Sequence, residues 1–210
     1  MEQRSRMIRT AVLKTLSIKR RVTTAVRSNG SLHPGAANKL LLKALFGAQH
    51  GLRVNVDVAA GAHHCRLCTS WREVRRASTL LTKEPGTIAW LRASIQPNDT
   101  VLDIGANVGT YTIYAAHLGG PGVKVFAVEP HLPNATRLIE NVSANGLGEQ
   151  VRVLTVALGA GFGFADFQYH QWSAGSALSQ LGRAVDHRGQ PFRPAASEFK
   201  LATSVDHLIV

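Results

Sequence analysis

The sequence VLDIGANVGTY, residues 101–111, decides the fold of this chain. Its first four residues are three apolar side chains around Asp103, a pattern typical of a parallel strand buried on both faces. Because glycine lacks a Cβ, the backbone can turn sharply at Gly105 and pass close to a ligand. From Gly109 onward apolar residues recur at helical spacing until Gly119-Gly120, where we expect the helix to end. The stretch therefore predicts a strand, a tight turn, and a helix whose N-terminus offers N–H groups to an anion.

Two classes of nucleotide-type ligand suit such a turn, and the glycine spacing separates them. The dinucleotide-binding motif is G-x-G-x-x-G, but counted from Gly105 its second and third glycines fall on Asn107 and Thr110. The chain instead has Asp103 before the turn and its second glycine at Gly109. A carboxylate there repels a pyrophosphate and attracts a cation. S-adenosylmethionine carries an ammonium group for Asp103 and a carboxylate for the helix N-terminus, so the charge pattern favours this methyl donor over NAD.

The next segment repeats the pattern of a strand with an acidic end. Residues 123–129 predict a second strand that closes at Glu129, 20 residues after Gly109 (129 − 109). A carboxylate there can accept hydrogen bonds from both ribose hydroxyls. Pro133 suits the first turn of a following helix, and residues 151–156 predict a third strand. We expect three apolar residues to line the inner face of that helix: Leu138, Ile139 and Val142.

A tight turn in an ordinary α/β sheet is the plainer interpretation, but two acidic strand ends coincide with the glycine pair. Three segments also carry a family resemblance: VLDIGANVGTYTIYAA (101–116), VFAVEPHLPNATRLIENVSANG (125–146) and VRVLTVALGAGFGFADF (151–167). They resemble the FkbM class of S-adenosylmethionine-dependent methyltransferases. The resemblance extends over residues 84–208, where 84–99 is similar to the family's lead-in helix. It implies a class I, Rossmann-like fold and methylation of a hydroxyl on a sugar, glycan or natural-product acceptor.

The predicted donor-binding residues lie on the D-x-G-A-N-x-G motif and at the end of the second strand. They are Asp103, Gly105, Ala106, Asn107, Gly109, Thr110, Tyr111 and Glu129. We expect the motif to contact the methionine part of S-adenosylmethionine and Glu129 to contact its ribose. The resemblance also implies that the small-residue loop 173–177 lies near the donor. Methyl transfer to a hydroxyl usually needs a general base; His131 and His170 are candidates by residue type alone, so the catalytic residue stays unassigned.

The chain stops where the family continues. Strands are predicted at 164–169 and 199–205, followed by the start of a helix at 206–209. In the family a further core strand then lies beside the first one. We therefore expect an incomplete α/β parallel sheet with Val101–Ile104 on an open apolar edge, which favours self-association. A non-catalytic donor-binding fragment is the alternative to an active methyltransferase.

The positive charge is concentrated near the N-terminus. Residues 1–76 hold 15 Lys and Arg against three acidic residues, a net +12, and residues 77–210 hold 9 against 10, a net −1. The chain thus divides into a basic, partly helical arm (1–50), a strand with a basic connector (51–83) and the methyltransferase-like part (84–210). A basic amphipathic helix can bind nucleic acid or anionic membrane, so a basic-arm adaptor is a third hypothesis beside a merely solvated tail.

Membrane, metal and redox features are sparse in the sequence. No run approaches about 18 apolar residues, so no transmembrane helix is expected. Both cysteines fall in the segment 63–68 together with two histidines. A structural zinc site usually draws on two separated ligand pairs, so no metal is expected there. Two cysteines favour a reducing compartment, and we expect the protein in the cytoplasm.

Overall fold

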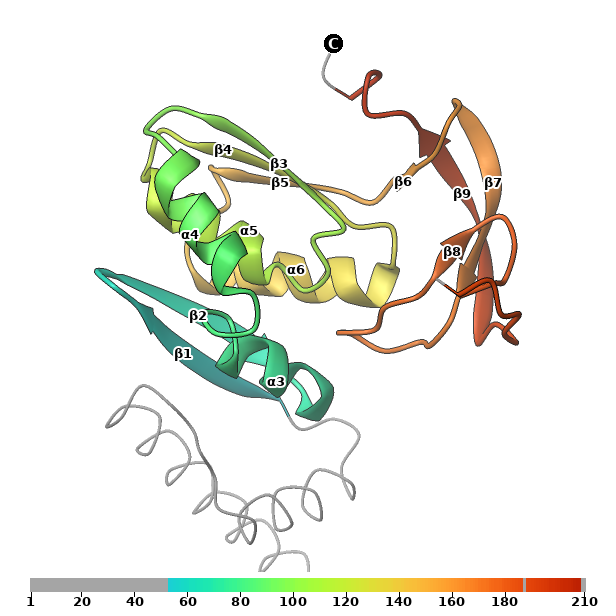
Figure 1. The fold of residues 1–210 in the computed structure, drawn as a ribbon, viewed down its shortest axis with the longest axis horizontal. Coiled ribbons are helices and arrows are strands. Elements are labelled where there is room, and N and C mark those ends of the chain that lie inside the picture. The colour runs from blue at the N-terminus through green and yellow to red at the C-terminus, as the bar shows by residue number, and fades with distance from the viewer. Residues whose placement is uncertain (1–52, 187, 209–210) are drawn as a thin grey trace, which may run out of the picture.

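The structure is a computed structural model of the chain, and it describes residues 53–186 and 188–208. The basic arm predicted for residues 1–50 lies outside the described residues. Figure 1 shows three units: a hairpin with a short helix, a central sheet with helices beneath it, and a second sheet beside the carboxyl ends of the central strands.

The first unit is more ordered than the sequence predicted. The strands β1 (Val54–Ala60) and β2 (His63–Thr69) pair antiparallel, and α3 (Trp71–Ser78) follows. The strand predicted within residues 51–83 is confirmed by β1, but the sequence analysis did not predict β2. The segment expected to be a basic connector contains α3. Ser70 and Glu73 form a capping box that starts this helix, with the Ser70 N–H donating to the Glu73 carboxylate at 2.7 Å.

Three parallel strands form the central sheet in the order β3-β4-β5: β3 (Thr100–Ile104), β4 (Lys124–Val128) and β5 (Val151–Leu154). Figure 1 shows three helices on one side of this sheet: α4 (Pro85–Ser94), α5 (Thr110–Gly119) and α6 (Leu132–Ala144). Ile113 and Tyr114 of α5 and Leu138 of α6 are fully buried with Val125 of the sheet. The predicted strand–turn–helix order is confirmed.

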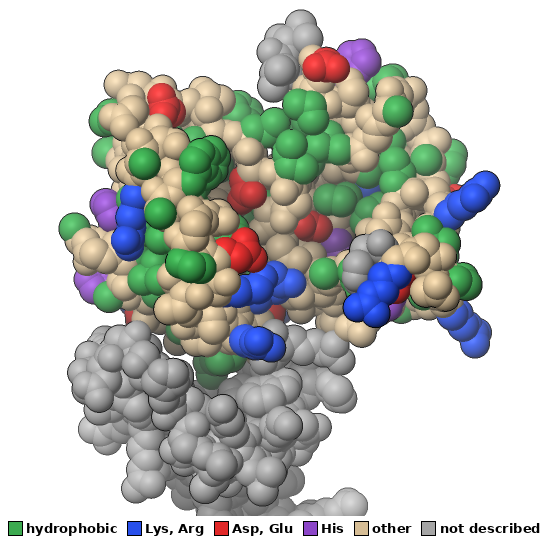
Figure 2. Space-filling view, in the orientation of Figure 1, with side chains coloured by type: hydrophobic (Ala, Val, Ile, Leu, Met, Phe, Trp, Pro, Cys, Tyr) green, Lys and Arg blue, Asp and Glu red, His purple; other side chains and the backbone are tan. Residues whose placement is uncertain are grey.

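None of the described helices covers the opposite face of the central sheet. In the described residues β3 pairs only with β4, and Ile104 and Phe126 are 55% and 37% exposed. Figure 2 shows hydrophobic side chains at the surface along the upper part of the molecule, where Figure 1 has this sheet. The prediction of a first strand buried on both faces is therefore wrong, because α4, α5 and α6 all cover the same face. Ile139 also differs from its predicted inward place, being 53% exposed.

The second sheet has the order β6-β9-β7-β8: β6 (Ala157–Leu158), β9 (Ala196–Thr203), β7 (Gly163–Tyr169) and β8 (Gln180–Leu181). The predicted strand at 164–169 is confirmed, and the one at 199–205 begins and ends earlier. Residues 206–208 form a turn where a helix start was expected. No described helix is long and apolar enough to cross a membrane.

Candidate functional site

The turn after β3 is held against β4 and is open on its other side. The N–H groups of Gly105 and Ala106 both donate to the Val128 carbonyl, at 2.9 and 3.1 Å. Gly105 and Gly109 have φ angles of +76° and +84°, in the region that favours glycine. A Cβ on Gly109 would lie 2.1 Å from Leu138 Cδ1, whereas no atom lies within 4 Å of one on Gly105. The turn therefore packs tightly on α6 at Gly109 and leaves free space at Gly105.

Asp103 is a half-buried carboxylate at the end of β3. The Thr112 hydroxyl donates to Asp103 Oδ2 at 2.5 Å, and the Thr112 N–H also donates to this carboxylate. Burial raises the pKa of Asp103, and the two hydrogen bonds from Thr112 oppose that rise. Among the described residues no cation forms an ion pair with Asp103. The site thus has an unmatched negative charge next to the turn, which suits a ligand cation.

The first turn of α5 has N–H groups to spare. The Thr112 N–H donates to Asp103, which leaves the backbone N–H groups of Thr110 and Tyr111. In the described part of the chain no acceptor binds these two N–H groups. Both side chains are half-buried. Burial raises the pKa of Tyr111, and the neighbouring Glu84 carboxylate, to which its hydroxyl donates, raises it further. A ligand carboxylate fits these free amides at a helix N-terminus.

Glu129 is 5% exposed and ties the turn to the start of α6. Its Oε2 accepts from the Asn107 N–H at 2.7 Å, and its Oε1 accepts from the His131 N–H at 2.8 Å and from Asn134 Nδ2 at 3.4 Å. Burial raises the pKa of Glu129, and these hydrogen bonds oppose the rise. A carboxylate has about four acceptor sites, so little capacity remains for the predicted ribose contact. Glu129 is first of all a structural link.

The loop 173–177 lies directly on the predicted donor turn. The Ser176 carbonyl accepts from Asn107 Nδ2 at 2.8 Å and from Asn134 Nδ2 at 3.0 Å. The Gly175 N–H donates to Asn134 Oδ1 at 2.8 Å. Asn134 therefore holds the backbone of two consecutive loop residues, Gly175 and Ser176, and Asn107 joins the loop to the turn.

Neither candidate histidine has the surroundings of a general base. His131 is buried at the N-cap of α6, where Nδ1 accepts from the Asn134 N–H at 3.3 Å and Nε2 lies 2.8 Å from the Gln171 carbonyl. This network assigns the proton to Nε2, and burial lowers the pKa of His131. The His170 ring packs edge-on against Phe192, 4.9 Å between centroids. His131 is a structural cap, and the catalytic base stays unassigned.

Two residues of the site escaped the sequence-based prediction: Thr112 and Asn134. Asn134 stands one helical turn before the buried Leu138, so a polar residue on the inner face of a predicted helix was a usable signal. Thr112 carried no such signal, because a threonine in a helix is common. Among the described residues no group of three His, Cys, Asp or Glu side chains has the spacing of a metal site.

No known family profile matches the sequence, and no curated protein matches it. Solved structures resemble part of it. An S-adenosylmethionine-dependent methyltransferase from Aquifex aeolicus shares 26% identity at a TM-score of 0.31, over 36% of this chain and 39% of that chain. One from Agrobacterium tumefaciens shares 16% identity at a TM-score of 0.37, over 50% of this chain and 33% of that chain. The chain thus spans less than half the length of the structures it matches.

Proposed function

We propose that this chain carries the donor-binding part of an S-adenosylmethionine-dependent methyltransferase of the FkbM class. The observation that carries the proposal is the turn between β3 and α5. It combines a half-buried carboxylate without an ion-pair partner in the described residues, free space at Gly105, and two N–H groups without a described acceptor. An ammonium, a close-lying ligand backbone and a carboxylate are the complementary groups.

Different residues of the turn bind different groups of the donor. Asp103 holds the ammonium, and the Thr110 and Tyr111 amides hold the carboxylate. The methionine part lies on the backbone of four residues of the turn: Gly105, Ala106, Asn107 and Gly109. Glu129 holds the backbone of the turn by accepting from the Asn107 N–H, and its remaining acceptor site binds a ribose hydroxyl. When bound, S-adenosylmethionine supplies a methyl group on a sulfonium, and the chain supplies position.

The acceptor is proposed from the family resemblance. In that class it is a hydroxyl on a sugar, glycan or natural product. His131 and His170, the two candidates by residue type, lack the surroundings of a general base, so the base is left unassigned in this proposal. A second interpretation is a non-catalytic donor-binding fragment, and it is favoured by the edge of β3 with which no described strand pairs. On that interpretation the fragment pairs with itself through this edge.

The test is an equilibrium titration of the full chain with S-adenosylmethionine and, separately, with NAD. We expect binding of the first and none of the second. Asp103→Asn removes the charge that holds the ammonium, so it should weaken binding of the methyl donor about 10- to 100-fold. Asp166→Asn is the matched control, because Asp166 is exposed on β7. A folded chain that binds NAD more tightly, or that binds the donor equally well as Asp103→Asn, would contradict the proposal.

A further inference from the structure

Arg76 is a half-buried cation without a counter-ion in the described structure. It lies in the last turn of α3, and its guanidinium donates to the Gly175 carbonyl from Nε at 3.2 Å and Nη2 at 3.0 Å. Glu73, one turn earlier, pairs instead with Arg137 at 3.0 Å. No described carboxylate forms an ion pair with Arg76. A buried charge is costly unless an opposite charge matches it, so the guanidinium is suited to a ligand anion.

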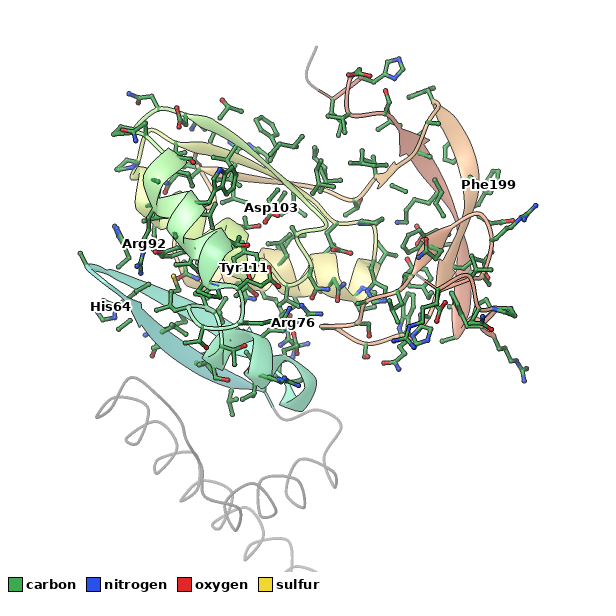
Figure 3. All side chains as sticks on the ribbon, viewed as in Figure 1. His64, Arg76, Arg92, Asp103, Tyr111 and Phe199 are labelled. Atoms are coloured by element: carbon green, nitrogen blue, oxygen red, sulfur yellow. The ribbon has the colours of Figure 1, made fainter. Side chains whose placement is uncertain are left out.

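The place of Arg76 connects it with the donor turn. It binds the carbonyl of Gly175, and the next carbonyl, that of Ser176, binds the Asn107 side chain. Figure 3 shows Arg76 and Tyr111 in the middle of the molecule, between α3 and α5, with Asp103 beyond them on β3. The positive charge of Arg76 also acts on the Tyr111 hydroxyl: burial and Glu84 raise the pKa of Tyr111, and Arg76 opposes the rise. Arg76 therefore lies near the side chain of Tyr111, a residue in the first turn of α5.

We propose that Arg76 binds the carboxylate of the methionine part of the donor. The inference rests on the proposed function and adds a residue from outside the segment that resembles the family. The Gly175 carbonyl takes donors from one side of the guanidinium, and the remaining N–H groups match the two oxygens of a carboxylate. Together with the Thr110 and Tyr111 amides, Arg76 recognises the amino-acid end, while Glu129 serves the nucleoside end. The hairpin unit thus takes part in donor specificity.

The test compares two ligands that differ at that end. S-adenosylhomocysteine has the amino-acid carboxylate, and 5′-methylthioadenosine lacks the whole amino-acid group. We would measure the dissociation constants of both for the full chain and for Arg76→Met. The variant should bind S-adenosylhomocysteine about 10- to 100-fold more weakly, as expected for a lost charge-assisted contact, and bind methylthioadenosine within about two-fold of the unchanged chain.

Two further variants separate recognition from general effects. Arg75→Met removes the same charge from the neighbouring, exposed residue of α3 and should leave both constants unchanged. Arg76→Lys keeps the charge but not the planar fork, so it should restore part of the affinity. An equal loss for both ligands in Arg76→Met would mean that Arg76 only positions the loop 173–177, and it would overturn the proposal, as would no loss for either.

Binding by the unchanged chain distinguishes a failure of the Arg76 proposal from a failure of the proposed function. Binding of S-adenosylhomocysteine that is insensitive to Arg76→Met overturns the role of Arg76 and leaves the proposed function intact. An unchanged chain that binds neither ligand overturns the proposed function, and the role of Arg76 with it. Binding of ADP in preference to S-adenosylhomocysteine, lost in Arg76→Met, would assign the guanidinium to a phosphate and also overturn this proposal.

Discussion

The fold disfavours the charged form of Asp103, so the effect of this residue on protein stability depends on pH in a defined direction. Burial raises its folded-state pKa, so the folded chain holds the proton more firmly than the unfolded chain does. Its contribution to stability is therefore fully present below the ordinary pKa of about 4 and is lost as the pH rises through the folded-state pKa.

Asp103→Asn should consequently be more stable than the unchanged chain at pH 7. Asparagine cannot ionise, and its oxygen still accepts from Thr112. The difference in unfolding free energy, measured by urea denaturation, should shrink toward zero as the pH falls to about 4. Because the charge of Asp103 also helps to raise the pKa of Glu129, the difference between the two chains includes that effect on Glu129. A difference that stays constant over this range would contradict the assignment.

Glu129→Ala is expected to weaken the fold as well as the donor site. The buried carboxylate accepts from the Asn107 and His131 N–H groups, and each buried donor left without a partner costs about 1–3 kcal/mol. The free energy of unfolding should therefore fall by about 2 kcal/mol or more, as measured by urea denaturation. Glu149→Ala, on the exposed rim after α6, serves as the control. A loss of donor affinity without any loss of stability would show that Glu129 acts only on the ligand.

The sequence located the acidic strand ends but not what holds them. Asp103 and Glu129 stand out because each follows an apolar strand. Their partners, Thr112 and Asn134, act through hydrogen bonds whose geometry exists only once α5 and α6 have packed. Asn134 also binds the loop 173–177, about 40 residues farther along the chain, and no local pattern predicts such a contact.

At the scale of elements, the contact between the glycine turn and α6 is tight enough to test. Gly109→Ala forces a Cβ into a site 2.1 Å from Leu138 Cδ1 at a φ of +84°. Strain of about 1 kcal/mol adds to overpacking of about 1–3 kcal/mol. We expect the unfolding free energy to fall by about 2–4 kcal/mol in a urea titration.

Gly105→Ala is the matched control for that loss. Its φ is +76°, and no atom lies within 4 Å of the added Cβ. Only the backbone strain applies, so the loss should be about 1 kcal/mol. Equal losses in the two variants would contradict the close packing of α6 on Gly109.

The elements with clean hydrophobic periodicity were predicted well, and the basic ones were not. The strands β3, β4 and β5 and the helices α5 and α6 carry apolar patterns and glycine or proline ends. Helix α3 was missed because its seven residues from Arg72 to Ser78 are mostly charged or small. It exists because Glu73 caps its start and pairs with Arg137 inside the molecule. The capping box is a local signal that the sequence analysis missed, whereas the pair with Arg137 is a tertiary contact that the local sequence does not encode.

For the whole molecule, we propose that the chain self-associates through the edge and the face of the central sheet that no described element covers. Ile104 lies at the end of the edge strand and is 55% exposed. Lysine on an exposed edge blocks strand pairing. Ile104→Lys should therefore raise the monomer fraction in sedimentation velocity. Ile139→Lys changes an isoleucine of similar exposure, 53%, on α6 and should leave the distribution unchanged. A monomeric unchanged chain would contradict this proposal.

The most direct measurement for the central claim is hydrogen exchange of the full chain with and without saturating S-adenosylhomocysteine. We expect slower exchange in peptides that cover residues 105–112 and 173–177, because the ligand contacts the turn and the loop lies against it. No change is expected in β8, the edge strand of the second sheet. Protection confined to another region, or no protection by a ligand that demonstrably binds, would contradict the claim that the turn between β3 and α5 is the donor site.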